Sequence, residues 1–274
     1  MHSAIHGLYR PDSIFWRVNR EWLIGLAGAR AVMLEMAHPL IAAGVAQHSN
    51  FRGDPLGRLY RTMRPMTDLT FGDAVEARDA TRRIHHCHQH INGSAPEANG
   101  THYDANDPHL KFWVLATLID SVLRVYELFV TPLSPAEKES YYQDSGVMAR
   151  WLGIPTELVP STYADFNAYV DAMLVSGTLK VGDNAREIIN AIFASPLVGG
   201  MARALSFVSI GLLPESLRAA YNLRWDAKRE QRMQQFAKFS RRVRPFIPNR
   251  IAVHPKAWSA EKMRKYIELS VGRI

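Results

Sequence analysis

The chain has 274 residues, a formal net charge of +7 and one cysteine, Cys87; 47% of its residues are hydrophobic and 22% are charged. These values are those of an ordinary globular protein and exclude a disordered, collagenous or coiled-coil chain. One cysteine excludes a disulfide framework and a multi-cysteine zinc or iron–sulfur centre. A chain of this length buries enough surface to fold without a metal or a disulfide.

The hydrophobic pattern is helical along almost the whole chain, and the apolar–polar alternation that is typical of strands is not found. Helices are predicted over 20–37, 40–48, 55–63, 73–92, 108–130, 135–152, 162–176, 184–194, 198–210, 214–220, 224–242 and 256–269. We therefore expect an all-α fold, with residues 1–274 forming one domain and residues 244–274 forming a C-terminal extension packed on it.

Several helix ends are marked by their residues. Three starts combine an N-cap side chain with a proline at the first helical position, namely Asp54-Pro55, Asp107-Pro108 and Ser134-Pro135. Glu137 completes a capping box in the third. Gly93 is predicted as a left-handed C-cap, followed by a polar loop over 94–106. The helix that begins at residue 55 is expected to end near Arg64-Pro65, and 244–255 is expected to be extended.

The positive charge is local, because residues 224–250 hold nine Lys or Arg side chains and two acids. This pattern fits a patch for anionic lipid or nucleic acid. It also fits an ordinary solvated helix face, and no nucleic-acid motif accompanies it. No secretory or transit signal is recognised in the first twenty residues, and the hydrophobic stretch 22–45 contains Arg30, Glu35 and His38. We therefore expect a soluble, cytoplasmic protein with no nucleic-acid partner and at most peripheral membrane contact.

Four histidines crowd the helix predicted over 73–92, and a helical wheel distinguishes them. Its apolar stripe is formed by Ala77, Ala80, Ile84, Cys87 and Ile91. At about 100° per residue, His88 lies roughly 40° from Ile84, on this stripe. His86 and His90 fall on the opposite face, and His85 lies at the margin. His88 is thus the histidine directed at the core, as a hydrogen-bonded core residue or as a metal ligand.

A second cluster lies in the helix that begins at Pro55. Arg58, Arg61 and Thr62 are at positions i, i+3 and i+4, so two guanidiniums and a hydroxyl share one face. Such a face can bind carboxylates or polarise a bound oxygen species, and it can equally be an exposed cationic surface.

The third feature is a run of small residues, 42–46, which His38 and His48 bracket. Small side chains permit the close approach of a neighbouring helix or of a flat ligand. Glycine-rich nucleotide-binding loops, a nucleophile elbow and an HExxH zinc motif are absent from the sequence.

Together, in this order, these segments resemble the MpaB and latex-clearing-protein oxygenase family. The matching strings are AHPLIAAGVAQHSNFRGDPLGRLYRT, TFGD, RRIHHCHQHINGSAP, HYDANDPHLKFWVLATLIDSVLRVYELFVTPLSPAEKESYYQD and LGIP. The later LLPESLRAAYNLRW and RPFIPNRIAVHP are also similar to the family's tail, so that the resemblance covers roughly residues 15–255.

The resemblance implies an all-α fold around one buried b-type haem with a histidine as proximal ligand. His88 matches that ligand, and Arg58, Arg61 and Thr62 match the distal polar group. Ile84, His38 and His48 are further candidates for contact with the haem. Arg61 stands where the rubber-cleaving branch has a lysine, and arginine is a very poor metal ligand.

The function that this resemblance implies is oxygenation with dioxygen. The expected substrate is a hydrophobic alkene or isoprenoid-like molecule, held by apolar residues such as Phe112, Trp113 and Leu115. Two alternatives stay open. One is a non-catalytic protein that binds haem or a hydrophobic ligand on the same scaffold. The other is a metal-free helical protein.

Overall fold

The computed structural model describes residues 7–53, 55–194 and 199–271. The helices of the first half are α1 (Ile14–Asn19), η2 (Trp22–Ile24), α2 (Gly25–Met36), α3 (Pro39–His48), α4 (Pro55–Phe71), α5 (Ala74–His88), η3 (Pro96–Ala98) and α6 (Pro108–Phe129). Those of the second half are α7 (Pro135–Trp151), η4 (Thr156–Leu158), α8 (Tyr163–Val175), α9 (Asp183–Ala194), α10 (Gly199–Leu212), α11 (Glu215–Ala220), α12 (Ala227–Val243), η6 (Arg244–Phe246), α13 (Asn249–Ala252) and α14 (Pro255–Val271). The all-α prediction is therefore confirmed, apart from one short hairpin of β1 (Asn92–Ala95) and β2 (Thr101–Asp104).

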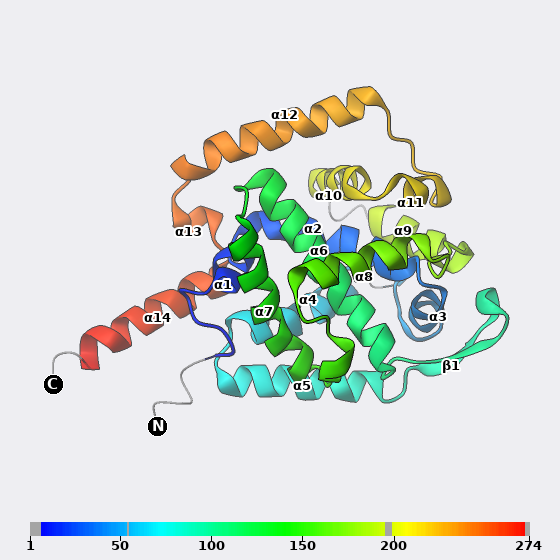
Figure 1. Cartoon of the computed structure of the whole chain (residues 1–274), viewed down its shortest axis with the longest axis horizontal. Coiled ribbons are helices and arrows are strands. Elements are labelled where there is room, and N and C mark those ends of the chain that lie inside the picture. The colour runs from blue at the N-terminus through cyan, green and yellow to red at the C-terminus, as the bar shows by residue number, and fades with distance from the viewer. Residues whose placement is uncertain (1–6, 54, 195–198, 272–274) are drawn as a thin grey trace.

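The centre of the molecule is α6, which packs along α2 and also contacts α7 and α12. Figure 1 shows α6 crossing the molecule between α5 at one edge and α12 at the opposite edge. Its apolar side chains are buried on nearly every side, as expected for a helix surrounded by others.

One buried ion pair crosses this centre. Arg30 of α2 is 1% exposed and lies 2.7 Å from a carboxylate oxygen of Asp120 in α6. The guanidinium also donates to Ser121 Oγ at 2.7 Å and to the Leu212 carbonyl at 2.9 Å. A buried charge needs such partners, so α2, α6 and α10 are held in one mutual arrangement.

Two of the predicted helix starts are confirmed by their caps. Asp107 accepts a hydrogen bond from His109 N at 2.7 Å, and Ser134 with Glu137 forms a full capping box on α7. Asp54 lies outside the described residues. A further capping box, Asp73 with Glu76, begins α5.

The predicted end of α4 near Arg64-Pro65 is wrong, since the helix continues through Pro65 to Phe71. A proline in a helix interior costs about 3 kcal/mol. Leu69 and Phe71 beyond the proline are nevertheless buried, and Asp68 bonds to cations of two other helices. Packing therefore overrides the local signal.

The predicted polar loop over 94–106 is also wrong. Residues 92–95 pair antiparallel with 101–104, with Gly93 opposite Tyr103. Gly93 thus lies in a strand and not at a left-handed C-cap, and the residues with positive φ in the turn are Asn99 and Gly100. The strands are too short to show an apolar–polar alternation, which explains why the sequence did not predict them.

The segment after α12 is more helical than expected, because η6 and α13 interrupt 244–255. Arg244 pairs with Glu21 at 2.6 Å, and an isolated antiparallel bridge joins Glu21 to Val253. Further along, Glu261 of α14 accepts from Trp16 Nε1 at 2.7 Å. The C-terminal segment is thereby attached to α1 and to the start of η2.

No single helix in the described ranges is long and apolar enough to cross a membrane. The pair Trp22–Met36 and Pro39–His48 meets the same criterion only when taken together, across a bend of 104°.

Candidate functional site

The helical wheel over 73–92 agrees with the burial of its four histidines, and His85, which it placed at the margin, is half-buried. His86 and His90 are exposed and lie side by side, with ring centroids 6.2 Å apart. His88 is half-buried and extends the buried side of the helix. Cys87, which the wheel placed on the same stripe, is exposed, because the helix ends at His88 and leaves its last turn only partly covered.

The imidazole of His88 has an unpaired ring nitrogen and a lowered pKa. Its Nδ1 is buried and has no hydrogen-bond partner. Burial lowers the pKa of His88, nearby Lys111 and His85 lower it further, and Asp104 opposes them. The ring is therefore neutral near pH 7, and neutral imidazole is the form that binds a metal.

His38 is buried and, like His88, has an unpaired Nδ1 and a lowered pKa. It precedes α3 without capping that helix, its Nδ1 has no hydrogen-bond partner, and burial lowers its pKa against the opposing charge of Asp107. Trp113 Nε1, in the second turn of α6, is likewise buried and unpaired.

These three nitrogens belong to segments around the start of α6. Figure 1 shows the end of α5, which carries His88, meeting the first turn of α6. Buried polar groups are hydrogen-bonded in most proteins, so three unpaired ring nitrogens around one helix start need an explanation. A ligand bound between these segments would provide partners for them.

The other predicted haem-contacting histidine, His48, has a different environment. Its Nε2 lies 3.2 Å from the Asn92 carbonyl and 3.1 Å from the Tyr103 hydroxyl. A Cβ on Gly44 would lie 3.3 Å from the Tyr103 ring. The small residues of α3 therefore permit close packing of the β-hairpin, and His48 joins the helix to that hairpin.

The predicted cationic face lies on α4. Arg61 and Thr62 are exposed, and the side chain of Arg58 lies outside the described part of the structure. Because α5 follows α4 after a turn and the two helices pack together, the start of α4 lies at the same end of the pair as His88. Arg61 and Thr62 are the seventh and eighth of the 17 residues of α4, near the middle of the helix, so their contact with the surroundings of His88 stays a prediction.

The predicted apolar lining is packed as core. Phe112, Trp113 and Leu115 are each at most 3% exposed, and Phe112 contacts Tyr169 of α8 with ring centroids 4.9 Å apart. Ile84 is half-buried and packs against the same core.

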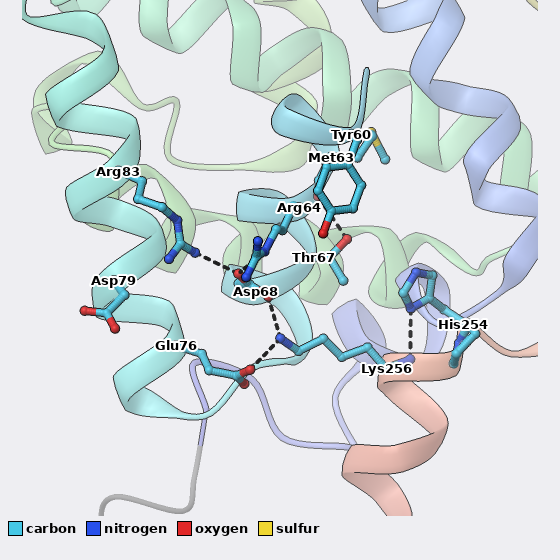
Figure 2. A pocket seen from close by; sticks show the side chains of 11 residues that line it. Tyr60, Met63, Arg64, Thr67, Asp68, Glu76, Asp79, Arg83, His254 and Lys256 are labelled. Carbon is cyan, nitrogen blue, oxygen red and sulfur yellow. Dashed lines mark hydrogen bonds and ion pairs between the residues drawn. The ribbon is translucent and has the colours of Figure 1, made fainter. Parts of the chain in front are cut away.

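An open groove of about 660 Å³ lies elsewhere on the α4–α5 pair, against the start of α14 (Figure 2). Its lining is rich in charge of both signs, with Arg64, Asp68, Glu76, Arg83 and Lys256 among its residues. None of the predicted site residues whose side chains the structure describes lines it. Ligand pockets for apolar molecules are lined mainly by apolar side chains, so this groove does not suit a hydrophobic substrate.

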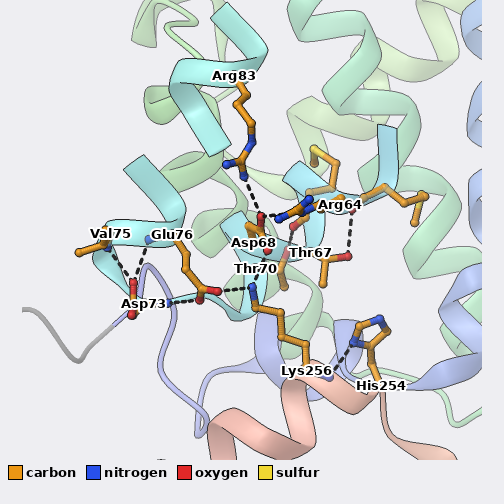
Figure 3. A network of polar contacts seen from close by, with 12 residues as sticks. Arg64, Thr67, Asp68, Thr70, Asp73, Val75, Glu76, Arg83, His254 and Lys256 are labelled. Carbon is orange, nitrogen blue, oxygen red and sulfur yellow. Dashed lines mark hydrogen bonds and ion pairs between the residues drawn. The ribbon is translucent and has the colours of Figure 1, made fainter. Parts of the chain in front are cut away.

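Ion pairs form the floor of this groove (Figure 3). Buried Asp68 accepts from Arg83 at 2.8 Å and from Lys256 at 2.5 Å, and Lys256 also reaches Glu76 at 2.8 Å. The network joins α4, α5 and α14. The network is not apparent from the sequence, because Asp68 and Lys256 are 188 residues apart.

Within the described ranges, no group of three or more His, Cys, Asp or Glu side chains is arranged to hold a metal ion. A haem needs only one or two protein ligands, because its porphyrin supplies the others.

Comparison with protein families gives the chain its class. The family described as "ER-bound oxygenase mpaB/B'/Rubber oxygenase, catalytic domain" matches residues 16–242. The chain belongs to this family. The MpaB/rubber-oxygenase match begins within α1, ends in the last turn of α12, and stops two residues before the segment that we predicted as a C-terminal extension.

Among curated proteins, similar relatives of this MpaB/rubber-oxygenase chain are mycobacterial. Two uncharacterised proteins, from Mycobacterium tuberculosis and Mycobacterium bovis, are each 23% identical over 234 residues, covering 82% of this chain and 90% of theirs. No solved structure matches the chain.

Proposed function

We propose that this member of the MpaB/rubber-oxygenase family is a haem b-dependent oxygenase that acts on a hydrophobic alkene or isoprenoid-like substrate with dioxygen. The family is one of oxygenase catalytic domains, which supports the reaction class. The observation that carries the proposal is the buried, unpaired Nδ1 of His88 in a ring of lowered pKa.

The residues present suit a haem. His88 offers a neutral imidazole on the half-buried face of α5. His38 and Trp113 add two more buried nitrogens without partners. When bound, the haem would supply the activation of dioxygen. His88 would hold the iron, and Ile84, one turn before it on α5, would contact the macrocycle.

The polar side chains of α4 would bind the haem carboxylates and dioxygen. Guanidiniums bind carboxylates with two parallel hydrogen bonds, so Arg61 is suited to a haem propionate. Thr62 carries a hydroxyl that can donate to a bound oxygen species. Arg58 would act with Arg61 on a haem propionate, as its spacing in the sequence predicts. Because arginine does not ligate metals, Arg61 would not bind the iron, whereas a lysine at this position could.

His38 and His48 differ as candidates for contact with the haem. His38 is buried and unpaired and keeps a candidate role toward the haem. His48 is exposed and its Nε2 already bonds within the α3–hairpin contact, so it is the weaker candidate. Phe112, Trp113 and Leu115 are packed as core on α6, so their contact with a hydrophobic substrate stays a prediction.

The proposal is tested by offering haem-loaded protein two hydrocarbons that differ only in their double bonds, squalene and squalane. Cleavage of one C=C bond by one molecule of dioxygen gives two carbonyl groups, with one oxygen atom in each. We expect oxygen consumption and carbonyl products with squalene alone, and label from ¹⁸O₂ in both carbonyls. A haem protein that consumes no oxygen with squalene or other alkenes would be the non-catalytic binding protein.

A further inference from the structure

The face of α12 that points away from the core carries cations and one aromatic ring. Lys228, Arg232, Gln235, Phe239 and Arg242 follow one another at spacings of four and three residues, and all are exposed. The opposite face is buried through Met233 and Ala237, with Ser240 Oγ bonded to the Phe129 carbonyl at 2.8 Å. The orientation of α12 is therefore fixed, and its basic stripe faces outward.

Large apolar side chains are exposed beside this stripe. Phe239 is 64% exposed, Phe246 of η6 is 83% exposed and Ile251 of α13 is 64% exposed. Glu21 forms a bridge with Val253, the residue that follows α13. Trp22, which is 53% exposed, therefore lies near the end of α13. Scattered apolar side chains are normal on a surface, but a group gathered around one helix end marks an interaction site.

The charge of this region is of one sign. No Asp or Glu occurs between residues 231 and 260. Arg232, Lys238, Arg241, Arg242 and Arg250 make no ion pair with any described residue, whereas Arg244 is neutralised by Glu21. Five cations are thus left for an external partner.

We propose that the outward face of α12, together with η6 and α13, is a surface that binds peripherally to membranes containing anionic lipid. We call it the α12–α13 surface. Its cations would contact lipid phosphates, and Phe239, Phe246, Ile251 and Trp22 would enter the region between the headgroups and the acyl chains. This inference does not depend on the haem or on the reaction.

A membrane fits this surface better than a nucleic acid does. Phosphates of either partner would satisfy the cations, but a nucleic-acid backbone gives no apolar environment to Phe246 or Ile251, which stand largely free of the protein. The combination of Lys and Arg with Phe, Trp and Ile on one face is typical of helices that lie in a lipid interface.

The α12–α13 surface and the predicted haem site lie at opposite edges of the molecule, since α12 and α5 are separated by α6 (Figure 1). Attachment through α12 would leave the end of α5 that carries His88 away from the lipid. Variants of the surface should therefore change membrane binding without changing haem content, which separates the two proposals.

The test is co-sedimentation with vesicles of phosphatidylcholine alone and of phosphatidylcholine with 40% phosphatidylglycerol. One variant combines Phe239→Ser, Phe246→Ser and Ile251→Ser, and a second combines Arg232→Gln, Lys238→Gln and Arg242→Gln. The matched controls are Val175→Ser, 85% exposed on α8, and Arg78→Gln, exposed on α5. We expect at least tenfold tighter binding to the anionic vesicles, reduced by added salt. We also expect at least a tenfold loss in both surface variants and no change in either control.

Each contrary outcome overturns the proposal. Wild-type protein that stays in the supernatant with anionic vesicles would do so. Surface variants that bind as the controls do would also contradict it. Tighter binding to duplex DNA than to anionic vesicles, unaffected by the triple serine variant, would assign the cations to nucleic acid instead. Circular dichroism of every variant verifies that the fold is intact, and the substituted positions are all exposed.

Discussion

Among the clustered histidines, His88 has a buried Nδ1 without a hydrogen-bond partner, whereas His86 and His90 are exposed. The helical period of α5 alone separated His88 from His86 and His90, and the structure confirms it, because His88 is half-buried whereas His86 and His90 are exposed. It could not separate His38 from His48, because both bracket the same short helix. Only the packing of the β-hairpin shows that His48 is bonded and that His38 is buried without a partner.

Arg30 holds a buried ion pair at the centre of the molecule, so its removal should be costly. Replacement by methionine leaves Asp120 in the core with Arg124 as its remaining cationic partner. Breaking a buried ion pair by removing one member typically costs about 3–5 kcal/mol. We expect Arg30→Met to lower the free energy of unfolding in urea by that amount.

Arg124→Met is the matched control, because it removes the half-exposed partner of the same carboxylate. The Arg124 side chain is half in solvent and its removal leaves the Arg30–Asp120 pair intact, so the control should cost at most about 1 kcal/mol. Equal losses in the two variants would contradict the central role given to Arg30.

At the scale of helices and strands, local signals predicted starts better than ends. Asp107 and the Ser134–Glu137 box begin α6 and α7 where the sequence placed them, since a cap needs only its own turn. Pro65 predicted an end of α4 that does not occur, because the residues after it are stabilised by α5 and α14. The β-hairpin was missed because it is held by its contact with α3 more than by strand-forming residues.

Lys256 is the side chain that ties α14 to the α4–α5 pair. Burial acts to lower the pKa of Lys256, but its bonds to Asp68 and Glu76 outweigh burial and raise it, so the ammonium is charged at all ordinary pH values. Lys256→Met removes both bonds and leaves Asp68 with Arg83. Hydrogen bonds to charged groups contribute about 1.5–3 kcal/mol, and the remaining partner reduces the loss, so we expect about 1–2 kcal/mol.

Hydrogen exchange identifies where that loss falls. Amides of α14 should exchange faster in Lys256→Met, whereas those of α6 should not change until the whole molecule unfolds. Lys180→Met is the control, because its side chain is exposed and makes no ion pair with the described residues. Unchanged protection of α14 in Lys256→Met would show that other contacts hold the helix.

At the scale of the whole molecule, the sequence predicted the fold class and the family but not the relation between surfaces. The family match from 16 to 242 agrees with the motifs that suggested it. The mixed-charge groove depends on side chains from α4, α5 and α14, and no local pattern links them. The basic segment was visible in the sequence, but the exposed aromatic side chains beside it and its position opposite α5 required the structure.

The central claim is that His88 holds a haem, and haem content measured by pyridine haemochrome tests it most directly. His86 and His90 provide matched controls, because they lie on the same helix or directly after it and are exposed. With haem precursor supplied during expression, we expect wild type, His86→Ala and His90→Ala to carry haem and His88→Ala to lose stable binding. Full haem occupancy with an unchanged Soret band in His88→Ala, or loss of haem in either control, would contradict the claim.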